Sequence, residues 1–355
     1  MTIEAVHQVV PSLRRWDAVG DHTRRLRDVL RGAGVRSEIF SDDVDPALAA
    51  EARPLRELPP PDPARTAVVY QCSIGNEVVD ALVARGEPLV VDYHNLTPVG
   101  MLLRWAPDMA HLVGWGRSQV RQLALHAVLG VGDSDFNTAE LDHLGYRRTA
   151  TAPILLDPDV VAADEGAEGE RDGSWLFVGR VVPNKAHHDL IAAFAWHRRH
   201  HDPAAVLHVV GGVAVPAYQA ALEAMADRLG VAGAVRFHGA VTPEQRDALY
   251  RRCGVFVCLS DHEGFCIPLL EAMAHRLPIV AYAAAAVPET VGTAALVLPA
   301  KSPSLVAAAA REVLADEALR TEMVTRGLAR LAHFHPDAVA ARHLAALRSA
   351  LDLPG

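Results

Sequence analysis

Strand-like apolar runs alternate with helical stretches rich in alanine and arginine along the whole chain of 355 residues. This alternation constrains the fold most, because strands separated by helices pair in parallel and carry helices on both faces. The predicted strands are residues 4–10, 35–40, 67–71, 89–93, 128–131 and 149–152, followed by 175–178, 206–210, 235–238, 255–259, 279–282 and 295–298. The predicted helices include residues 21–31, 76–85, 137–144, 187–200, 216–229, 243–252 and 268–275. The sequence therefore predicts an α/β protein with two doubly wound, Rossmann-like halves.

One segment interrupts this alternation. Residues 157–172 are acidic, contain proline and glycine, and have no apolar period, which predicts a linker or a long surface loop. After residue 302 the pattern is helical to the end. We therefore expect an N-terminal domain at residues 1–160, a second domain at 161–331 and a closing helix at 332–355. Doubly wound sheets bind ligands beyond the carboxyl ends of their strands, so the expected site is a central cleft that both domains face.

Charge and composition narrow the class of protein. A net charge of −9 and a pI near 6.0 argue against a nucleic-acid binder, which needs a basic footprint. The four cysteines show no C-x-x-C or C-x-x-H spacing, which suits a reducing cytosol. The start lacks the pattern of a signal peptide. The longest uncharged apolar stretch, residues 277–287, has eleven residues, whereas a membrane span needs about 20. We predict a cytoplasmic protein that does not cross a membrane.

The first strong motif is FVGRVVPNK at residues 177–185, where a predicted strand ends in Gly-Arg and a lysine precedes a helix. Only Lys185 and Lys301 are lysines among 34 basic residues, so a lysine carries more information here than an arginine. Cations at a strand's carboxyl end, beside a helix N-terminus, suit a diphosphate. The alternative is a surface turn in which Arg180 and Lys185 are solvated.

The second motif is SDHEGFCIPLLEAM at residues 260–273, in which a strand feeds a loop and then a helix with Pro268 in its first turn. The backbone N–H groups of residues 265–267 are expected to point out of the helix start, where they could bind phosphate. Glu263 lies on the loop and Glu271 in the first helical turns. Considered singly, each glutamate has a simpler interpretation than ligand binding. Glu263 could be a solvated loop carboxylate, and Glu271 could serve only to compensate the helix dipole.

Together the two motifs resemble the C-terminal donor domain of the family 4 retaining glycosyltransferases of the GT-B fold. The resemblance rests on the Glu-x7-Glu pair and on the FVGRVVPNK loop. It implies that Arg180 and Lys185 bind the donor diphosphate, that Glu263 contacts the donor hexose and that Glu271 contacts the ribose. It also implies that the backbone amides of Phe265, Cys266 and Ile267 hold phosphate. Many members of the family have glycine where Cys266 stands, so this side chain must pack beside the phosphate.

The N-terminal half is similar to a subset of the same family. Residues 16–26, WDAVGDHTRRL, resemble its first glycine loop, in which Gly20 would let the backbone approach the donor phosphates or the acceptor. A simple N-cap turn is the alternative. Residues 91–98, VDYHNLTP, resemble a family stretch whose histidine, here His94, lines the donor-sugar pocket; a satisfied core histidine is the alternative. Residues 132–137, GDSDFN, resemble a strand-to-helix turn that faces the cleft. The acceptor-side candidates are Asp21, His22, Asn95 and Ser134.

The resemblance covers nearly the whole chain and is weakest over residues 41–66 and 157–172. The closing helix, residues 336–351, looks like the family helix that returns to the first domain. The donor base should lie near Gly211 and Val241, but no residue there separates a UDP-, GDP- or ADP-hexose. The expected acceptor is a carbohydrate, a polyol or a lipid-linked molecule. The oligomeric state is left open.

The implied reaction moves a hexose from a nucleotide diphosphate to an acceptor hydroxyl and keeps the anomeric configuration. Its catalytic candidates are His94, Arg180, Lys185 and Glu263. Because cations and a helix N-terminus can stabilise the leaving diphosphate, and because the Asp and His residues lack clear metal spacing, we expect no catalytic metal and no cofactor. The family implies a front-face substitution in which the leaving phosphate helps to take the acceptor proton.

Two alternative functions stay open. A sugar-nucleotide epimerase or hydrolase would share the phosphate site but needs a dedicated general base. A non-catalytic sugar-nucleotide sensor is not excluded by fold. Separately, seven arginines between residues 14 and 36 suggest peripheral membrane contact, although Asp17, Asp21 and Asp28 among them favour a solvated helix face.

Overall fold

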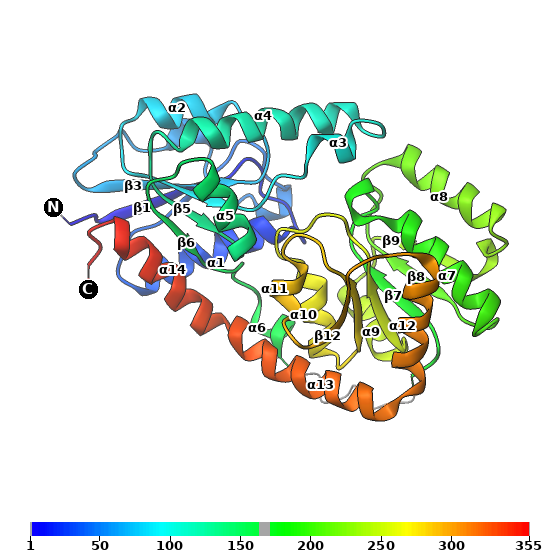
Figure 1. The fold of residues 1–355 in the computed structure, drawn as a ribbon. Coiled ribbons are helices and arrows are strands. Elements are labelled where there is room, and N and C mark those ends of the chain that lie inside the picture. The colour runs from blue at the N-terminus through cyan, green and yellow to red at the C-terminus, as the bar shows by residue number, and fades with distance from the viewer. Residues whose placement is uncertain (1, 163–170, 355) are drawn as a thin grey trace. The chain divides into compact units, whose positions relative to one another are not determined.

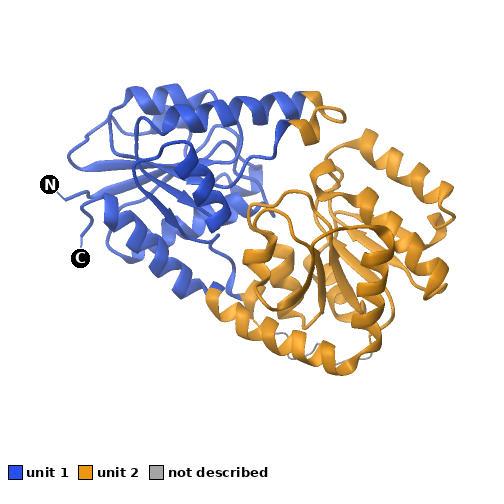
Figure 2. Ribbon diagram, in the orientation of Figure 1, with its two compact units in different colours: residues 1–99, 108–158, 334–355 blue, residues 100–107, 159–333 orange. Residues whose placement is uncertain are grey.

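The computed structural model describes residues 2–162 and 171–354, and the chain divides into two compact units (Figure 2). Unit 1 comprises Met1–Val99, Asp108–Pro158 and Phe334–Gly355, and unit 2 comprises Gly100–Pro107 and Asp159–His333. Residues 163–170 of the predicted acidic linker lie outside the described residues, whereas Pro158–Val161 forms a short helix, α6. Each unit contains one six-stranded sheet in which every pair is parallel.

The sheet of unit 1 has the strand order β2-β1-β3-β4-β5-β6 (Figure 1). Its strands are β1 Ala5–Val9, β2 Ile39–Phe40, β3 Thr66–Cys72, β4 Leu89–Tyr93, β5 Ala127–Gly132 and β6 Thr149–Thr151. The helices of unit 1 are α1 Ala18–Gly32, α2 Val78–Ala84, α4 Pro107–Leu123, α5 Asp135–His143 and α14 Pro336–Ala350, whereas α3 Val99–Leu102 falls almost entirely in unit 2.

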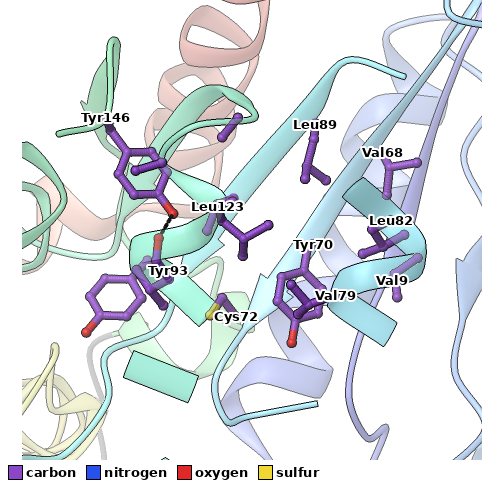
Figure 3. Packing of buried hydrophobic residues seen from close by; sticks show 14 of the residues in the cluster. Val9, Val68, Tyr70, Cys72, Val79, Leu82, Leu89, Tyr93, Leu123 and Tyr146 are labelled. Carbon is purple, nitrogen blue, oxygen red and sulfur yellow. Dashed lines mark hydrogen bonds between the residues drawn. The ribbon is translucent and has the colours of Figure 1, made fainter. Parts of the chain in front are cut away.

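Alternate residues of the unit 1 strands enter different cores, because successive side chains of a strand point to opposite faces. On β3, Tyr70 packs in one cluster with α2, α4 and α5, where Figure 3 shows it near Val79 and Leu82. Val69 packs on the other face with Leu26 of α1 and with Val339 and Leu347 of α14. The last helix of the chain therefore completes the core of unit 1.

The sheet of unit 2 has the order β12-β11-β10-β7-β8-β9. Its strands are β7 Trp175–Val178, β8 Leu207–Val210, β9 Val235–Gly239, β10 Val255–Cys258, β11 Ile279–Tyr282 and β12 Ala295–Leu298. Its helices, besides α6, are α7 His187–His200, α8 Pro216–Arg228, α9 Pro243–Arg252, α10 Ile267–Ala274, α11 Val287–Val291, α12 Pro303–Ala315 and α13 Glu317–Leu331. The predicted α/β class with two doubly wound sheets is confirmed.

Two predicted boundaries near the N-terminus are wrong. Helix α1 begins at Ala18, three residues before the predicted start, because the Asp17 side chain caps it by accepting a hydrogen bond from the Gly20 N–H at 3.0 Å. The strand predicted at 35–40 shrinks to Ile39–Phe40, and Arg36 makes only an isolated bridge to Ala5.

Strand order fixes where each sheet can bind a ligand. In unit 2 the chain runs from β7 outward to β9 and then returns to the other side of β7 as β10, so the switch point lies between β7 and β10. In unit 1 the corresponding point lies between β1 and β3, because β2 and β3 flank β1. The loops that follow these strands are the places to look for a site.

Candidate active site

A cation and a carboxylate meet at the switch point of unit 2. A short 3-10 turn, Pro183–Lys185, follows β7, and the loop after β10 carries Glu263. The Lys185 Nζ donates a hydrogen bond to Glu263 Oε2 at 2.5 Å, and their side chains are 21% and 6% exposed. Burial lowers the pKa of Lys185, but the Glu263 carboxylate outweighs it, so the pKa is raised. Lys185 therefore stays charged at neutral pH.

Backbone contacts hold the Glu263 loop in place. The Asn184 Nδ2 donates to the His262 carbonyl at 3.2 Å, and the Asp261 N–H donates to the Asn184 carbonyl at 2.8 Å. The second lysine, Lys301, extends this support, because its Nζ lies 2.6 Å from Asp261 Oδ1 and 2.5 Å from Asp189 Oδ2. Both lysines of the chain therefore serve the same corner of unit 2. Sequence reasoning did not find the role of Asn184 or Lys301.

The N-terminus of α10 also lies at the β7/β10 switch point, beside Lys185 and Glu263. Cys266 is its N-cap with φ 75°, a left-handed conformation that costs a non-glycine residue about 1 kcal/mol and explains why glycine suits this position. The Thr290 Oγ1 donates to the Phe265 carbonyl at 2.6 Å. The sulfurs of Cys258 and Cys266 and a Glu263 oxygen lie within 4.8 Å of one another. Ile267 opens the helix, so residues 265–267 stand where the positive end of its dipole lies.

Glu271 has its own protein partners. Its Oε2 accepts a hydrogen bond from Tyr250 at 2.8 Å, and its Oε1 lies 2.8 Å from a guanidinium nitrogen of Arg246. Tyr250 and Arg246 both come from α9, and nothing in the sequence pointed to them. Burial, followed by the Glu271 charge, raises the pKa of Tyr250 well above its usual range. The predicted ribose contact of Glu271 stays a prediction.

The remaining candidates of unit 2 line the carboxyl edge of its sheet. Gly211 has φ 143°, and a Cβ there would lie 2.2 Å from the Gly179 carbonyl oxygen, so only glycine lets the ends of β7 and β8 approach this closely. Arg180 is exposed just after β7. Val241 is half-buried in the loop between β9 and α9. The structure brings Lys185 and Glu263 into contact, whereas it shows no contact of Arg180 with either among the described residues.

Unit 1 contains a buried cluster that the sequence did not reveal, which we call the histidine–aspartate cluster: His22, Asp92, His94, Asp133 and His343. Within it, His22 Nε2 lies 2.9 Å from Asp92 Oδ2, while His22 Nδ1 accepts the Leu155 N–H at 3.0 Å. His22 is therefore the tautomer that donates from Nε2. The members come from α1, the ends of β4 and β5, and α14.

His94 donates from both ring nitrogens. Its Nδ1 lies 3.1 Å from both oxygens of Asp133, and its Nε2 lies 2.5 Å from Gln71 Oε1. The Gln71 amide is oriented by a relay, because its Nε2 donates to Gln8 Oε1 and Gln8 Nε2 donates to the Thr23 carbonyl, each at 2.9 Å. An acceptor oxygen thus faces each ring nitrogen, which favours an imidazolium. Burial lowers the pKa of His94, but Asp133 and then Asp92 outweigh it and raise the pKa to about 9.

This charge state predicts a pH effect on stability. Because the pKa of His94 is raised from 6.5 to about 9 by folding, its contribution is fully present below about pH 6.5 and is lost as pH rises through 9. Relative to His94→Gln, the wild type should lose about 3 kcal/mol of unfolding free energy over that interval. Urea unfolding at several pH values measures it, with the exposed His111→Gln as the control. A constant difference between wild type and His94→Gln across the interval would contradict the imidazolium.

The other candidates of unit 1 have structural partners. The Gly20 N–H donates to the Asp17 cap, which agrees with the alternative of a simple N-cap turn, and the approach of Gly20 to the donor phosphates or the acceptor stays a prediction. Asp21 pairs with Arg24 at 2.5 Å. Asn95 has φ 67° and donates to Asn137 Oδ1 at 2.7 Å. Ser134 caps α5 by accepting the Asn137 N–H at 3.2 Å. His94, with a side chain 1% exposed, also lies inside the fold.

The arginine-rich stretch is largely neutralised by ion pairs. Six of its seven arginines pair with carboxylates: Arg14 with Asp43, Arg24 with Asp21, Arg25 with Asp157, Arg27 with Glu51, Arg31 with Glu38 and Arg36 with Glu4. Such pairing fits a solvated face better than a basic membrane patch. Within residues 2–162 and 171–354, no helix is both long and apolar enough to span a bilayer.

Among the described residues, three groups have the donor chemistry of a metal site, which the spacing of the residues in the sequence did not reveal. They are His22, Asp92 and His343; Asp92, His94 and Asp133; and Cys258, Glu263 and Cys266. In the first two groups the imidazoles of His22 and His94 already use both ring nitrogens in hydrogen bonds, which opposes ligation. The metal-free expectation therefore stays a prediction that needs a direct test.

The fold and this site define a doubly wound α/β protein in which a lysine–glutamate pair and the N-terminus of α10 meet at the switch point of the second sheet. Residues 163–330 match the family described as "Glycosyl transferases group 1". The chain is 34% identical over 216 residues to a D-inositol 3-phosphate glycosyltransferase of Geodermatophilus obscurus, covering 55% of this chain and 47% of that protein. It is 33% identical over 238 residues to a GDP-mannose-dependent alpha-(1-6)-phosphatidylinositol monomannoside mannosyltransferase of Mycobacterium tuberculosis, covering 59% and 60%.

Solved structures extend the likeness over the full fold. HepE of Anabaena, in complex with UDP and glucose, has a TM-score of 0.72 at 16% identity, covering 98% of this chain and 100% of that one. WaaG, a glycosyltransferase involved in lipopolysaccharide biosynthesis, has a TM-score of 0.71 at 14% identity, covering 97% and 99%. The chain spans about half the length of the curated relatives it matches. The family match over residues 163–330 agrees with the predicted resemblance to glycosyltransferases, and the structural likeness confirms the predicted GT-B fold.

Proposed function

We propose that the protein is a retaining hexosyltransferase, which moves a hexose from a nucleoside diphosphate to an acceptor hydroxyl without a metal. In this proposal unit 2 binds the donor and unit 1 binds the acceptor. The observation that carries it is the buried Lys185–Glu263 pair at the β7/β10 switch point, beside the N-terminus of α10. A cation, a carboxylate and a helix N-terminus in one corner can bind a phosphate and a sugar hydroxyl together.

Each group then has a part in the transfer. The bond between the anomeric carbon and the diphosphate oxygen breaks, while a bond forms from that carbon to the acceptor oxygen. Lys185, Arg180 and the amides of residues 265–267 stabilise the charge that grows on the leaving diphosphate. The acceptor proton passes to a leaving phosphate oxygen on the same face. Glu263 bonds the hexose hydroxyls and favours the positive charge that develops on the sugar.

The other candidate residues bind the donor or hold parts of the protein in position. Glu271, already oriented by Tyr250 and Arg246, bonds the ribose of the donor. Gly211 and Val241 border the base. The His94 imidazolium lies within the fold and acts by holding the end of β4 against Asp133, so we treat it as a positioning residue. The acceptor is a carbohydrate, a polyol or a lipid-linked molecule, and a cytoplasmic location with or without peripheral membrane contact stays a prediction.

Binding experiments identify which nucleotide base the donor carries. One relative is described as GDP-mannose-dependent and one structural neighbour contains UDP, so uridine, guanosine and adenosine donors all belong in the panel. A ligand at 100 times its Kd stabilises the native state by about 2.7 kcal/mol. One of UDP-, GDP- or ADP-hexose should therefore raise the Tm of the purified protein by several degrees. No shift with any of the three at millimolar concentration would contradict the proposed donor site.

Turnover should persist in excess chelator, because Lys185, Arg180 and the helix dipole take the place of an ion. The measurement is the rate of nucleoside diphosphate release after dialysis against EDTA, compared with the untreated protein, and we expect less than a twofold change. Loss of activity in EDTA, restored by magnesium or manganese, would show that a metal supplies the charge instead.

A further inference from the structure

We propose that a pocket at the switch point of unit 1 binds the acceptor, and that its negative charge selects an uncharged, hydroxyl-rich acceptor over a phosphorylated one. This inference rests on the proposed function, since it assigns the acceptor class of the same reaction. It places the acceptor on residues other than the four acceptor-side candidates that the sequence suggested.

The pocket has a volume of about 640 Å³ and lies at the carboxyl edge of the sheet. Its walls follow three neighbouring strands: Val10 after β1, Asp42 and Asp43 after β2, and Asn76 and Glu77 after β3. This volume falls in the range of small-molecule sites, about 300–1,000 Å³. The β1/β3 switch point is where a sheet of this order binds its ligand. Its position and volume therefore fit a small-molecule substrate.

One wall of the pocket is rigidly built. A Cβ on Gly75 would lie 2.7 Å from the Leu112 carbonyl oxygen and 2.8 Å from the Gly116 nitrogen, so the loop after β3 packs directly on the backbone of α4. The Gln119 amide locks this contact, because its Oε1 accepts the Asn76 N–H at 2.9 Å and its Nε2 donates to the Asn76 carbonyl at 2.7 Å. This packing fixes Trp115 as a half-buried pocket wall. A preformed wall lowers the ordering cost of binding.

The charges in the pocket decide the ligand class. Three carboxylates line it, those of Asp42, Asp43 and Glu77, against one guanidinium, that of Arg56. Asp43 is paired with Arg14, and Asp42 Oδ1 accepts the Leu55 N–H at 2.9 Å. Glu77 is exposed at the start of α2, and its side chain makes no capping hydrogen bond. Because Arg14 neutralises Asp43, Asp42 and Glu77 against Arg56 leave a net negative charge, which disfavours a phosphate, whereas hydroxyl groups can donate to the carboxylates.

Trp115 completes the match to a sugar or polyol. An aromatic ring offers a large apolar face together with a polar N–H, which suits a ligand that has both C–H faces and hydroxyl edges. Carboxylates beside it fix the orientation of the hydroxyl groups through charge-assisted hydrogen bonds. The combination favours a neutral polyhydroxylated acceptor over an apolar or an anionic one.

The test compares acceptors in matched pairs. Methyl α-mannoside, methyl α-glucoside and myo-inositol are each assayed against the corresponding sugar or inositol phosphate, and the readout is acceptor-stimulated release of nucleoside diphosphate. In the wild type, the best neutral acceptor should exceed its phosphorylated partner at least tenfold in kcat/KM. Glu77→Arg should reduce that ratio at least tenfold. Asp108→Arg is the control, because Asp108 is likewise an exposed carboxylate at the start of a helix but does not line the pocket.

The outcomes separate this inference from the proposed function. Preference for a phosphorylated acceptor, or an unchanged ratio in Glu77→Arg, would overturn the acceptor class. Donor hydrolysis without stimulation by any neutral member would also overturn it while leaving transferase chemistry in place. If no nucleoside diphosphate is released from any donor, with or without acceptor, the proposed function itself fails.

Discussion

Lys185→Ala should weaken nucleoside diphosphate binding by about 30- to 700-fold and slow turnover at least as much. In the proposed donor site, the change removes a partly buried cation that would contact the phosphates, and it leaves the Glu263 carboxylate, 6% exposed, without its partner. Truncating one partner of a buried charge pair costs about 2–4 kcal/mol, which corresponds to that range. Calorimetric titration with the nucleoside diphosphate measures the affinity, and product release measures the rate.

The matched control for this change is Arg311→Ala, which removes an exposed cation from α12 in the same unit. It should leave affinity and rate within twofold of the wild type. Circular dichroism and thermal unfolding establish that Lys185→Ala is folded. A folded Lys185→Ala protein with unchanged affinity and unchanged rate would remove Lys185 from the donor site.

Glu263→Gln and Glu271→Gln should fail in different ways. Glu263→Gln keeps shape and hydrogen-bonding capacity but loses the charge that, in the proposed role, faces the sugar, so kcat should fall about 100-fold or more while nucleotide affinity barely moves. Glu271→Gln should weaken free nucleoside diphosphate about tenfold or more, because the ribose contact exists in both the ground state and the transition state. Calorimetry and product release on the same preparations separate the two effects.

The contact between Glu271 and Arg246 supplies a second check, because Arg246→Gln should weaken nucleotide binding in the same direction by disordering Glu271. Equal loss of nucleotide affinity in Glu263→Gln and Glu271→Gln would show that the two roles are assigned wrongly. A sensor protein would show binding changes in both variants and no transfer product in any of them.

Local sequence signals predicted the framework of unit 2 well. The strands at 175–178, 279–282 and 295–298 and the helices at 187–200 and 243–252 agree with the structure residue for residue. Buried parallel strands appear in the sequence as short apolar runs. The start of α9 is marked by a capping box at Thr242 followed by a proline. Both signals are local, so they can be recognised in the sequence alone. Lys185 and Glu263 meet because they follow β7 and β10, which are adjacent strands in the sheet although they are far apart in the sequence.

The histidine–aspartate cluster of unit 1 could not be predicted in the same way. Its members are spread from His22 to His343, and no local pattern marks residues that converge only when α14 packs onto the first sheet. Gly20 shows a different difficulty, because the local pattern around it fits two structures. A glycine loop before a helix fits phosphate binding, but in the structure the Gly20 N–H donates to the side chain of Asp17, three residues earlier. The acidic pocket at the β1/β3 switch point likewise depends on tertiary contacts, because Gly75 and Gly116 make its wall only across two elements.

The most direct test of the account is NMR of the protein mixed with each nucleotide hexose and an acceptor panel. Phosphorus spectra follow release of the nucleoside diphosphate, and proton spectra report the anomeric configuration of the new glycoside. We predict release from one class of donor and a product with the donor's own anomeric configuration. A product of inverted configuration would contradict the retaining mechanism, and intact donor in every mixture would contradict the assignment of Lys185, Glu263 and α10 as a transferase site.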